Sequence, residues 1–219
     1  MKRVALTVVA IGLLIGPTGC QDANQSAPSV DAQAGVDCAY PAAGTPAKPV
    51  DPPAETGIAK AGTATATLHF KAGDVALTMN REAAPCTVNS FLSLAQQGYF
   101  DDTVCHRLVD TGIFILQCGD PSATGAGGPG YTIPDETDPG MTYPAGTVAM
   151  ANRGGNAATG GSQFFLVWAD TPLPPEYTVF GTMDKAGIDV VAGIAAEGID
   201  AADQTSPIAD ASIVSVSVG

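Results

Sequence analysis

A series of short strand-like runs, separated by Gly- and Pro-rich loops, constrains the fold of this chain more than any other feature. The runs are rich in Thr, Val, Ile and aromatic residues, and the first two flank a short loop, residues 71–74, that is typical of a β-hairpin. In order they are TATATLHF, VALTMN, TVCHRL, FILQC, TVAMAN, QFFLVWA, YTVFGTM and ASIVSVSV. The sequence therefore predicts one β-rich domain over residues 61–219.

Two segments of this region have the periodicity of amphipathic helices. The first begins at Pro85 and stops before Gly98, and its apolar residues at i, i+3, i+4 and i+7 are Val88, Phe91, Leu92 and Ala95. The second stops before Gly198, and its apolar positions are Ile188, Val191, Ile194 and Ala195. Together the runs predict a mainly-β fold, a closed eight-stranded antiparallel β-barrel capped by two α-helices.

The first twenty residues have the organisation of an export signal. A basic start, Met1 to Arg3, precedes an apolar run over residues 4–16 that is too short to span a bilayer comfortably. The stretch from Pro17 to Cys20 then resembles a bacterial lipobox, with proline where leucine is usual. We therefore expect lipidation of Cys20 and an exported lipoprotein on the outer face of the cell membrane. The alternatives are ordinary cleavage, which gives a secreted protein, and an uncleaved anchor.

Residues 21–60 differ in composition from the rest of the chain. They carry six prolines and many Ala, Ser and Asp, with almost no large apolar side chains. Such a segment buries too little apolar surface to offset its chain entropy. We expect a flexible tether, which Cys38 could pin onto the domain.

The four remaining cysteines are expected to form disulfides, because export places them in an oxidising compartment. Three pairings are possible, and the sequence alone leaves all three open. The predicted architecture favours Cys86 with Cys105 and Cys38 with Cys118, and the alternative is that some are small buried thiols. We expect no metal site, since there is no C-x-x-C pair and the chain has two histidines.

Charge and motif spacing exclude several functions. A net charge of −13 with nine cations opposes binding to nucleic acid, which needs clusters of Lys and Arg. Residues 125–130 satisfy G-x-G-x-x-G, but two prolines and no helical period follow, so a dinucleotide site is not expected. Ser162 lies in GGSQFF rather than in a nucleophile elbow. No cofactor is implied.

Two glutamines lie on strand faces that also carry large apolar residues. Alternation places Gln117 on the face of Ile115, and Gln163 on the face of Phe165. A glutamine among apolar groups is costly when sealed from water and useful when it lines a groove. Taken singly, each glutamine is better interpreted as a surface residue or a hydrogen-bonded core residue than as part of a groove.

Several separated motifs, taken together, resemble the signature of the cyclophilin family of peptidyl-prolyl isomerases. The resemblance runs from about Thr63 to the C-terminus and keeps the family's motif order. It rests on His106-Arg107, Phe114-Ile115-Leu116-Gln117, Gly119-Asp120, the Gly-rich loop, Met150-Ala151-Asn152, Gly161-Ser162-Gln163-Phe164-Phe165 and Val179-Phe180-Gly181. The family fold is an eight-stranded antiparallel barrel capped by two helices.

The resemblance also implies roles for individual residues. Arg107 corresponds to the catalytic arginine, and His106 to the histidine beside it, which more plausibly orients a neighbour than transfers a proton. The proline pocket and its surround correspond to Phe114, Ile115, Gln117 and Phe165. Contacts to the substrate backbone are implied for Gly125, Ala151, Asn152 and Gln163. Leu173 corresponds to the apolar wall near the pocket mouth, where Tyr177 stands in the place of a histidine.

The implied function is acceleration of rotation about Xaa-Pro bonds in unfolded or flexible polypeptides, which assists the folding of exported proteins without a cofactor. This sequence departs from the family in the longer loop over residues 109–112, in the expanded segment 153–158, and in Pro172, where many relatives carry tryptophan. We therefore expect weak cyclosporin binding. The alternatives are a binding module for proline-containing segments without catalysis, and a cell-surface scaffold that does not bind such segments.

Overall fold

The computed structural model describes residues 35–154 and 157–219. The expected signal peptide, Cys20 and the first part of the expected tether lie outside these residues. No described helix combines the length and apolar character needed to cross a bilayer.

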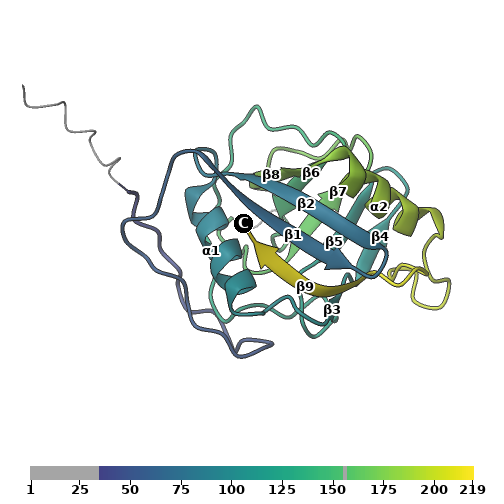
Figure 1. The fold of residues 1–219 in the computed structure, drawn as a ribbon, viewed down its shortest axis with the longest axis horizontal. Coiled ribbons are helices and arrows are strands. Elements are labelled where there is room, and N and C mark those ends of the chain that lie inside the picture. Colours follow the sequence, from purple (N-terminus) through teal and green to yellow (C-terminus); the bar gives the residue numbers. More distant parts are fainter. Residues whose placement is uncertain (1–34, 155–156) are drawn as a thin grey trace, which may run out of the picture. The chain divides into compact units, whose positions relative to one another are not determined.

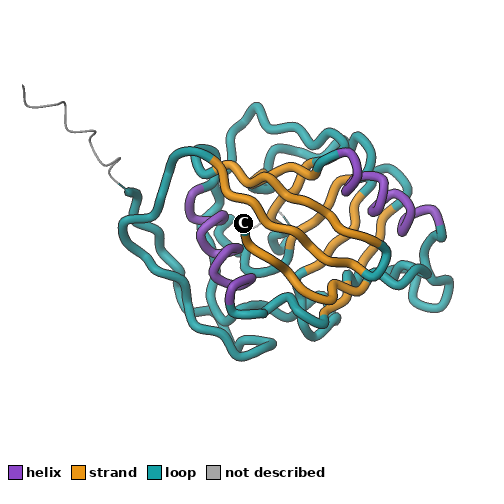
Figure 2. The backbone as a smooth tube through the Cα atoms, viewed as in Figure 1, coloured by secondary structure: helices purple, strands orange, loops and turns teal. Residues whose placement is uncertain are grey.

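Within the described residues, nine antiparallel strands form a single curled sheet (Figures 1 and 2). Their order across the sheet is β3-β9-β1-β2-β8-β6-β7-β5-β4. The strands are β1 (Thr63–Phe70), β2 (Gly73–Asn80), β3 (Thr103–Val104), β4 (Arg107–Val109), β5 (Ile115–Cys118), β6 (Thr147–Met150), β7 (Phe164–Val167), β8 (Val179–Met183) and β9 (Ser212–Val218).

The described part of the chain forms an open sheet of nine strands, which corrects the prediction of a closed eight-stranded barrel. The difference arises at residues 103–109. This run is divided into β3 and β4, which are the two outer strands of an open nine-stranded sheet. The division follows from a change of partner: β3 pairs with β9, and β4 pairs with β5. Between them the Cys105 N–H donates to the Ala211 carbonyl at 3.0 Å, so one extended segment serves both edges.

Two helices pack on this sheet, as predicted. Helix α1 (Pro85–Gln96) contacts β9, and helix α2 (Lys185–Ala196) contacts β2. Asp184 caps α2, because its side chain accepts a hydrogen bond from the Gly187 N–H at 2.7 Å. Of the apolar positions predicted for the two helices, those buried are Val88, Phe91, Ala95, Val191, Ile194 and Ala195.

An aromatic cluster fills the space between α1 and the sheet. The Phe91 ring of α1 lies with its centroid 5.1 Å from Phe100, 5.4 Å from Phe164 and 5.5 Å from Phe180. All four rings are fully buried. Aromatic pairs at these distances stabilise a core beyond the burial of their area, so this cluster fixes α1 on the inner face of the sheet.

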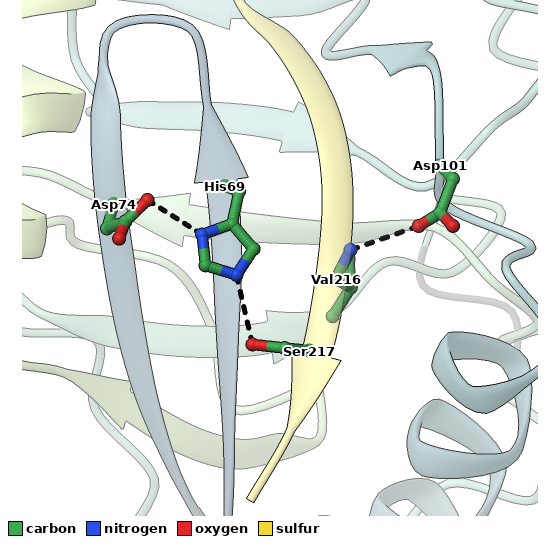
Figure 3. Close-up of polar contacts among 5 residues, drawn as sticks. All are labelled: His69, Asp74, Asp101, Val216 and Ser217. Atoms are coloured by element: carbon green, nitrogen blue, oxygen red, sulfur yellow. Dashed lines mark hydrogen bonds and ion pairs between the residues drawn. The ribbon is translucent and has the colours of Figure 1, made fainter.

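The outer face of β1, β2 and β9 is polar. His69 Nδ1 lies 2.8 Å from Asp74 Oδ1, and His69 Nε2 lies 3.0 Å from Ser217 Oγ (Figure 3). On the neighbouring side of β9, the Val216 N–H donates to the Asp101 carboxylate at 3.0 Å. These contacts connect three strands and the loop before β3 on a surface that is open to solvent.

The expectation of a flexible tether is corrected for residues 36–58, which lie along α1 (Figure 1). Cys38 and Tyr40 are buried, and the Tyr40 hydroxyl donates to the Cys86 carbonyl at 2.9 Å. Ile58 is also buried, and it pairs with Val36. The few apolar groups of this extension cannot form a core of their own, but they complete the core of the domain instead.

The favoured disulfide pairing was wrong. The structure contains Cys38–Cys86 and Cys105–Cys118, with Cα atoms 5.5 Å and 4.0 Å apart. Cys105 lies two residues before β4 and Cys118 is the last residue of β5, and the pairing of these strands brings the two cysteines together. Cys38 meets Cys86 because the extension follows the start of α1.

Candidate functional site

The alternation of side chains on five strands creates two faces with different chemistry. On one face, directly paired positions carry Leu108, Leu116, Leu166 and Val148, which are at most 1% exposed and belong to the main core. On the opposite face, the adjacent row of paired positions carries Arg107, Gln117, Phe165, Ala149 and Val179. Side chains opposite one another in a sheet share a face. The second row therefore places a cation, an amide and an apolar patch side by side.

A chain of hydrogen bonds runs along the polar half of this row. The Arg107 guanidinium donates from Nη1 to Gln117 Oε1 at 3.0 Å, and Gln117 Nε2 donates to Gln163 Oε1 at 2.8 Å. Gln163 Nε2 then donates to the carbonyls of Gly125 and Gly127 at 3.0 and 2.9 Å. The predicted grouping of these residues is observed, and the chain orients the guanidinium from one side.

A buried carboxylate holds the loop at the end of this chain. Asp120 is fully buried, and its two oxygens accept hydrogen bonds from the N–H groups of Ser122, Thr124 and Gly127 at 2.8, 3.1 and 3.0 Å. Burial by itself would raise the pKa of Asp120, but the hydrogen bonds from Ser122 and Gly127 outweigh it and hold the pKa below its usual value. The charged carboxylate thus fixes the carbonyls that Gln163 contacts.

The apolar half of the row is a cluster separate from the main core. Phe165 and Ile115 are 2% and 3% exposed and pack with Tyr143, Ala149 and Val167. The predicted residues Ala151, Leu173 and Tyr177 pack against the edge of this cluster. The Tyr177 ring stands edge-on to Phe165 at 5.4 Å, which gives the cluster an aromatic wall.

Phe114 does not join this apolar cluster, although it was predicted to. Its ring lies against Trp168, with centroids 5.0 Å apart, and its N–H donates to Thr171 Oγ1 at 2.9 Å. Phe114 precedes Ile115 on the chain, and strand alternation directs adjacent side chains to different faces. The pairing of Val109 with Ile115 leaves residues 110–114 beyond the ladder, and Arg107 is paired with Gln117 within it.

Asn152 lies beside Gln163 along the same groove. The Ala151 N–H donates to the Gln163 carbonyl at 2.9 Å, and Asn152 Nδ2 donates to the Glu176 carbonyl at 2.8 Å. Asn152, Gln163, Gln117 and Gly125 line one pocket of about 390 Å³. With Ala151, which also lines this pocket, five of the residues predicted to bind substrate surround a single cavity.

His106 is a buried residue that directly precedes Arg107 on the chain, and its ring lies next to Gly125. Neither ring nitrogen has a hydrogen-bond partner among the described residues. Desolvation lowers the pKa of His106, and the nearby Arg107 lowers it further, while Asp120 opposes the shift. The imidazole is therefore neutral at pH 7 and supports the loop from within the sheet wall.

The Asp74–His69–Ser217 array of Figure 3 has the connectivity of a hydrolase triad, but its surroundings differ from those of a triad. A triad needs a buried carboxylate that orients the histidine and stabilises its charge. Here the Asp74 side chain is 67% exposed and Ser217 is exposed as well. We assign this array a role in joining strands.

Several contributors to the site were not found from the sequence. Tyr143 was given no role, yet its hydroxyl donates to the Tyr177 carbonyl at 3.0 Å and accepts from the Tyr177 N–H. The organising role of Asp120 was missed, although an Asp followed by Ser, Thr and Gly is typical of a turn closed by a carboxylate. Residues 43–45, which reach the pocket from the extension, gave no signal.

These features define a class of protein. A family model described as "Cyclophilin type peptidyl-prolyl cis-trans isomerase/CLD" matches residues 65–218. The chain therefore belongs to the cyclophilin-type peptidyl-prolyl isomerase family.

Particular members of the family are similar over most of this chain. The chain is 45% identical over 188 residues to the probable peptidyl-prolyl cis-trans isomerase B of Mycobacterium leprae, covering 79% of this chain and 63% of that protein. It is 41% identical over 202 residues to the probable isomerase B of Mycobacterium tuberculosis, covering 84% and 65%. The match thus spans less than two thirds of the length of these relatives.

A solved structure confirms the fold. The cyclophilin-type isomerase of Cryptosporidium parvum is 28% identical, with a TM-score of 0.66, and the match covers 72% of this chain and 98% of that one. A second structure of that protein was obtained in the presence of the dipeptide Ala-Pro, with a TM-score of 0.64.

Proposed function

We propose that this chain is a peptidyl-prolyl cis–trans isomerase that acts on Xaa-Pro bonds of unfolded or flexible polypeptides. The observation that carries the proposal is the position of Arg107, which Gln117 holds at 3.0 Å in the same paired row as Phe165. This row places a fixed positive charge next to an apolar patch that fits a proline ring. Family membership supports it, as does the structure of the Cryptosporidium relative obtained in the presence of the dipeptide Ala-Pro.

The chemistry follows from the electronic change during rotation. Resonance makes the peptide bond planar and sets a barrier of about 18–20 kcal/mol. At the twisted transition state this resonance is lost, and the prolyl nitrogen regains a lone pair. A guanidinium that donates to this nitrogen stabilises the transition state more than either planar state, which is the requirement for catalysis.

The remaining residues position the substrate. Phe165, Ile115 and Tyr177 would enclose the proline ring, while Gln163 and Asn152 would hold the backbone on one side as the other rotates. A charge-assisted hydrogen bond contributes about 1.5–3 kcal/mol, which corresponds to roughly one to two decades of rate. No step in this mechanism transfers a proton or forms a covalent bond.

The test is X-Pro exchange in a short peptide, measured by NMR on full-length wild type, Arg107→Ala and Arg81→Ala. Arg81 serves as the matched control, because its guanidinium donates to the Thr63 carbonyl on the exposed end of β1. We expect exchange with wild type and Arg81→Ala, and a loss of about 10- to 100-fold with Arg107→Ala. Peptide binding without exchange in the wild type would instead support the non-catalytic module.

We further propose that the protein is exported and anchored by a lipid on Cys20, where it would assist the folding of exported chains. The basic start, apolar run and lipobox-like end support this proposal. Intact mass of the mature protein tests it, because a diacylglyceryl group on Cys20 adds a defined mass, whereas cleavage alone adds none. We also propose weak cyclosporin binding, since Pro172 supplies neither an indole ring nor an N–H donor.

A further inference from the structure

The extension described above, residues 36–58, lies ahead of the segment that matches the family model, residues 65–218. Its residues 43–45 nevertheless line the same 390 Å³ pocket as Gln163, Gly125 and Asn152. A segment outside the family domain therefore forms part of the wall of the groove that contains the site.

Backbone pairing fixes this wall in place. The Ala43 N–H donates to the Gly130 carbonyl at 2.8 Å, the Ala47 N–H donates to the Gly128 carbonyl at 2.9 Å, and the Thr132 N–H donates to the Pro41 carbonyl at 2.9 Å. These bonds run along the Gly-rich loop whose earlier carbonyls accept from Gln163. The extension thus supports the loop from behind and borders the cavity at the same time.

Two further features hold the extension close. Gly130 has a φ of +85°, and a Cβ at this position would lie 3.0 Å from Pro46 Cδ, so glycine permits the close approach of the two segments. On either side of the wall, the Cys38–Cys86 disulfide and the Lys48 ammonium anchor the segment, the latter by donating to the Gly98 carbonyl at 2.6 Å. Residues 43–45 are therefore held in a fixed position as part of the pocket wall.

The chemistry of the pocket indicates what it accepts. Its lining has hydroxyl and amide groups, including those of Thr45, Thr132 and Asn152, together with Arg153, and it has no carboxylate and no large aliphatic side chain. A polar side chain with hydrogen-bonding groups, such as glutamine, fits this lining better than an aliphatic one. The volume is at the lower end of the roughly 300–1,000 Å³ typical of ligand sites, which suits one residue and its backbone.

We propose that residues 43–45 of the extension are specificity determinants that select a polar residue over an aliphatic one on one flank of the substrate proline. This inference rests on the proposed isomerase function. The proline pocket and Arg107 are unaffected by it, so the extension would discriminate between peptides without altering the rotation step itself.

The test compares Thr45→Trp with Thr56→Trp in the full-length protein. Both threonines are exposed on the extension, but Thr56 does not line the pocket. The substrates are N-blocked Ala-Pro peptides in which the position two residues before or two residues after proline is Gly, Leu or Gln. The measurement is kcat/KM for each peptide, together with its dissociation constant from NMR titration.

For the wild type we expect at least a threefold preference for Gln over Leu at one of the two positions. Thr45→Trp should lose about tenfold on the Gln and Leu peptides at that position and stay within twofold of wild type on the Gly peptide. Thr56→Trp should follow wild type throughout. The unchanged Gly peptide also shows that Thr45→Trp is folded.

The inference is overturned if Thr45→Trp follows Thr56→Trp on every peptide, or if it weakens all peptides equally. Failure of the proposed function gives a different result, namely no exchange with wild type on any peptide. In that case the dissociation constants of the same series decide whether the wall selects the flanking residue.

Discussion

Gln117 on β5 donates a hydrogen bond from Nε2 to Oε1 of Gln163, the residue before β7, at 2.8 Å. Through this contact the loop at residues 120–127 is connected to the Arg107 guanidinium, which Gln117 also accepts from. The cation and the backbone-binding groups of the site therefore share one hydrogen-bond network.

We predict that Gln117→Ala and Gln163→Ala are not additive. Each should lower kcat/KM about 5- to 20-fold, because each leaves Arg107 less restrained, and the double variant should lose less than the product of the two. Interaction energies of roughly 0.5–3 kcal/mol are typical of residues in one network. A double-mutant cycle measured by peptide exchange checks this, with Gln97→Ala at the C-cap of α1 as control. Strict additivity would contradict a shared network.

Gly127→Ala should destabilise the protein and reduce turnover. A Cβ at Gly127 would lie 2.0 Å from Asp120 Oδ1, so the loop must move away from the carboxylate that organises it. Overpacking of this kind costs about 1–3 kcal/mol. Chemical denaturation measures the loss, and Gly128→Ala provides the control, since a Cβ there meets nothing within 4 Å. Equal stability of the two variants would show that the loop is not held as described.

Stability should fall as the pH is lowered from about 6.5, and His106 should be responsible. Its folded pKa lies below the ordinary value of 6.5, so the unfolded chain binds the proton more readily and stability rises with pH across this window. The slope is at most about 1.4 kcal/mol per pH unit for one group.

Denaturation of wild type and His106→Gln between pH 7 and pH 5 measures this effect. The variant should have a flatter profile than the wild type in that range. Asp120 acts in a different window: its folded pKa is lowered, so the stability it contributes is lost only below its ordinary value of 3.8. An unchanged slope in His106→Gln would assign the effect to other groups.

Peptide mapping without reduction should recover Cys38 linked to Cys86 and Cys105 linked to Cys118. Removing both members of the second pair by Ser substitution should cost about 3 kcal/mol, since the chain entropy of a loop closed over 13 residues is restored to the unfolded state. It should also lower turnover, because this disulfide flanks the Arg107–Gln117 pairing. The Cys38→Ser/Cys86→Ser variant should keep turnover of an Ala-Pro peptide. A Cys86–Cys105 fragment would contradict the structure.

Local sequence patterns were sufficient to predict the two helices, the β1–β2 hairpin and which side chains of the site share one face of a strand. Val88, Phe91 and Ala95 define one stripe of a helix, and alternation alone placed Ile115 with Gln117 and Gln163 with Phe165. These features depend on residues a few positions apart. The resemblance to the family then joined strands that are distant in the sequence.

The features that were missed depend on distant contacts. The extension has too few apolar residues to form a core, and nothing local shows that Tyr40 and Ile58 are buried by α1 and its neighbours. The disulfides follow from strand pairing and from the path of the extension, neither of which spacing reveals. Phe114 was assigned to the pocket by motif, whereas its backbone position directs it to Trp168.

The place of β9 between β3 and β1 has a consequence for synthesis. Until residues 212–218 have left the ribosome, β1 lacks one neighbour and β3 has none, so the two edges of the sheet cannot be brought into position. Pairings between segments this far apart in the sequence form slowly, because closing the long intervening loop costs entropy before the stabilising contacts form. The nascent polypeptide should therefore stay incompletely folded through most of translation, and the barrel-like sheet should assemble late, in one cooperative step.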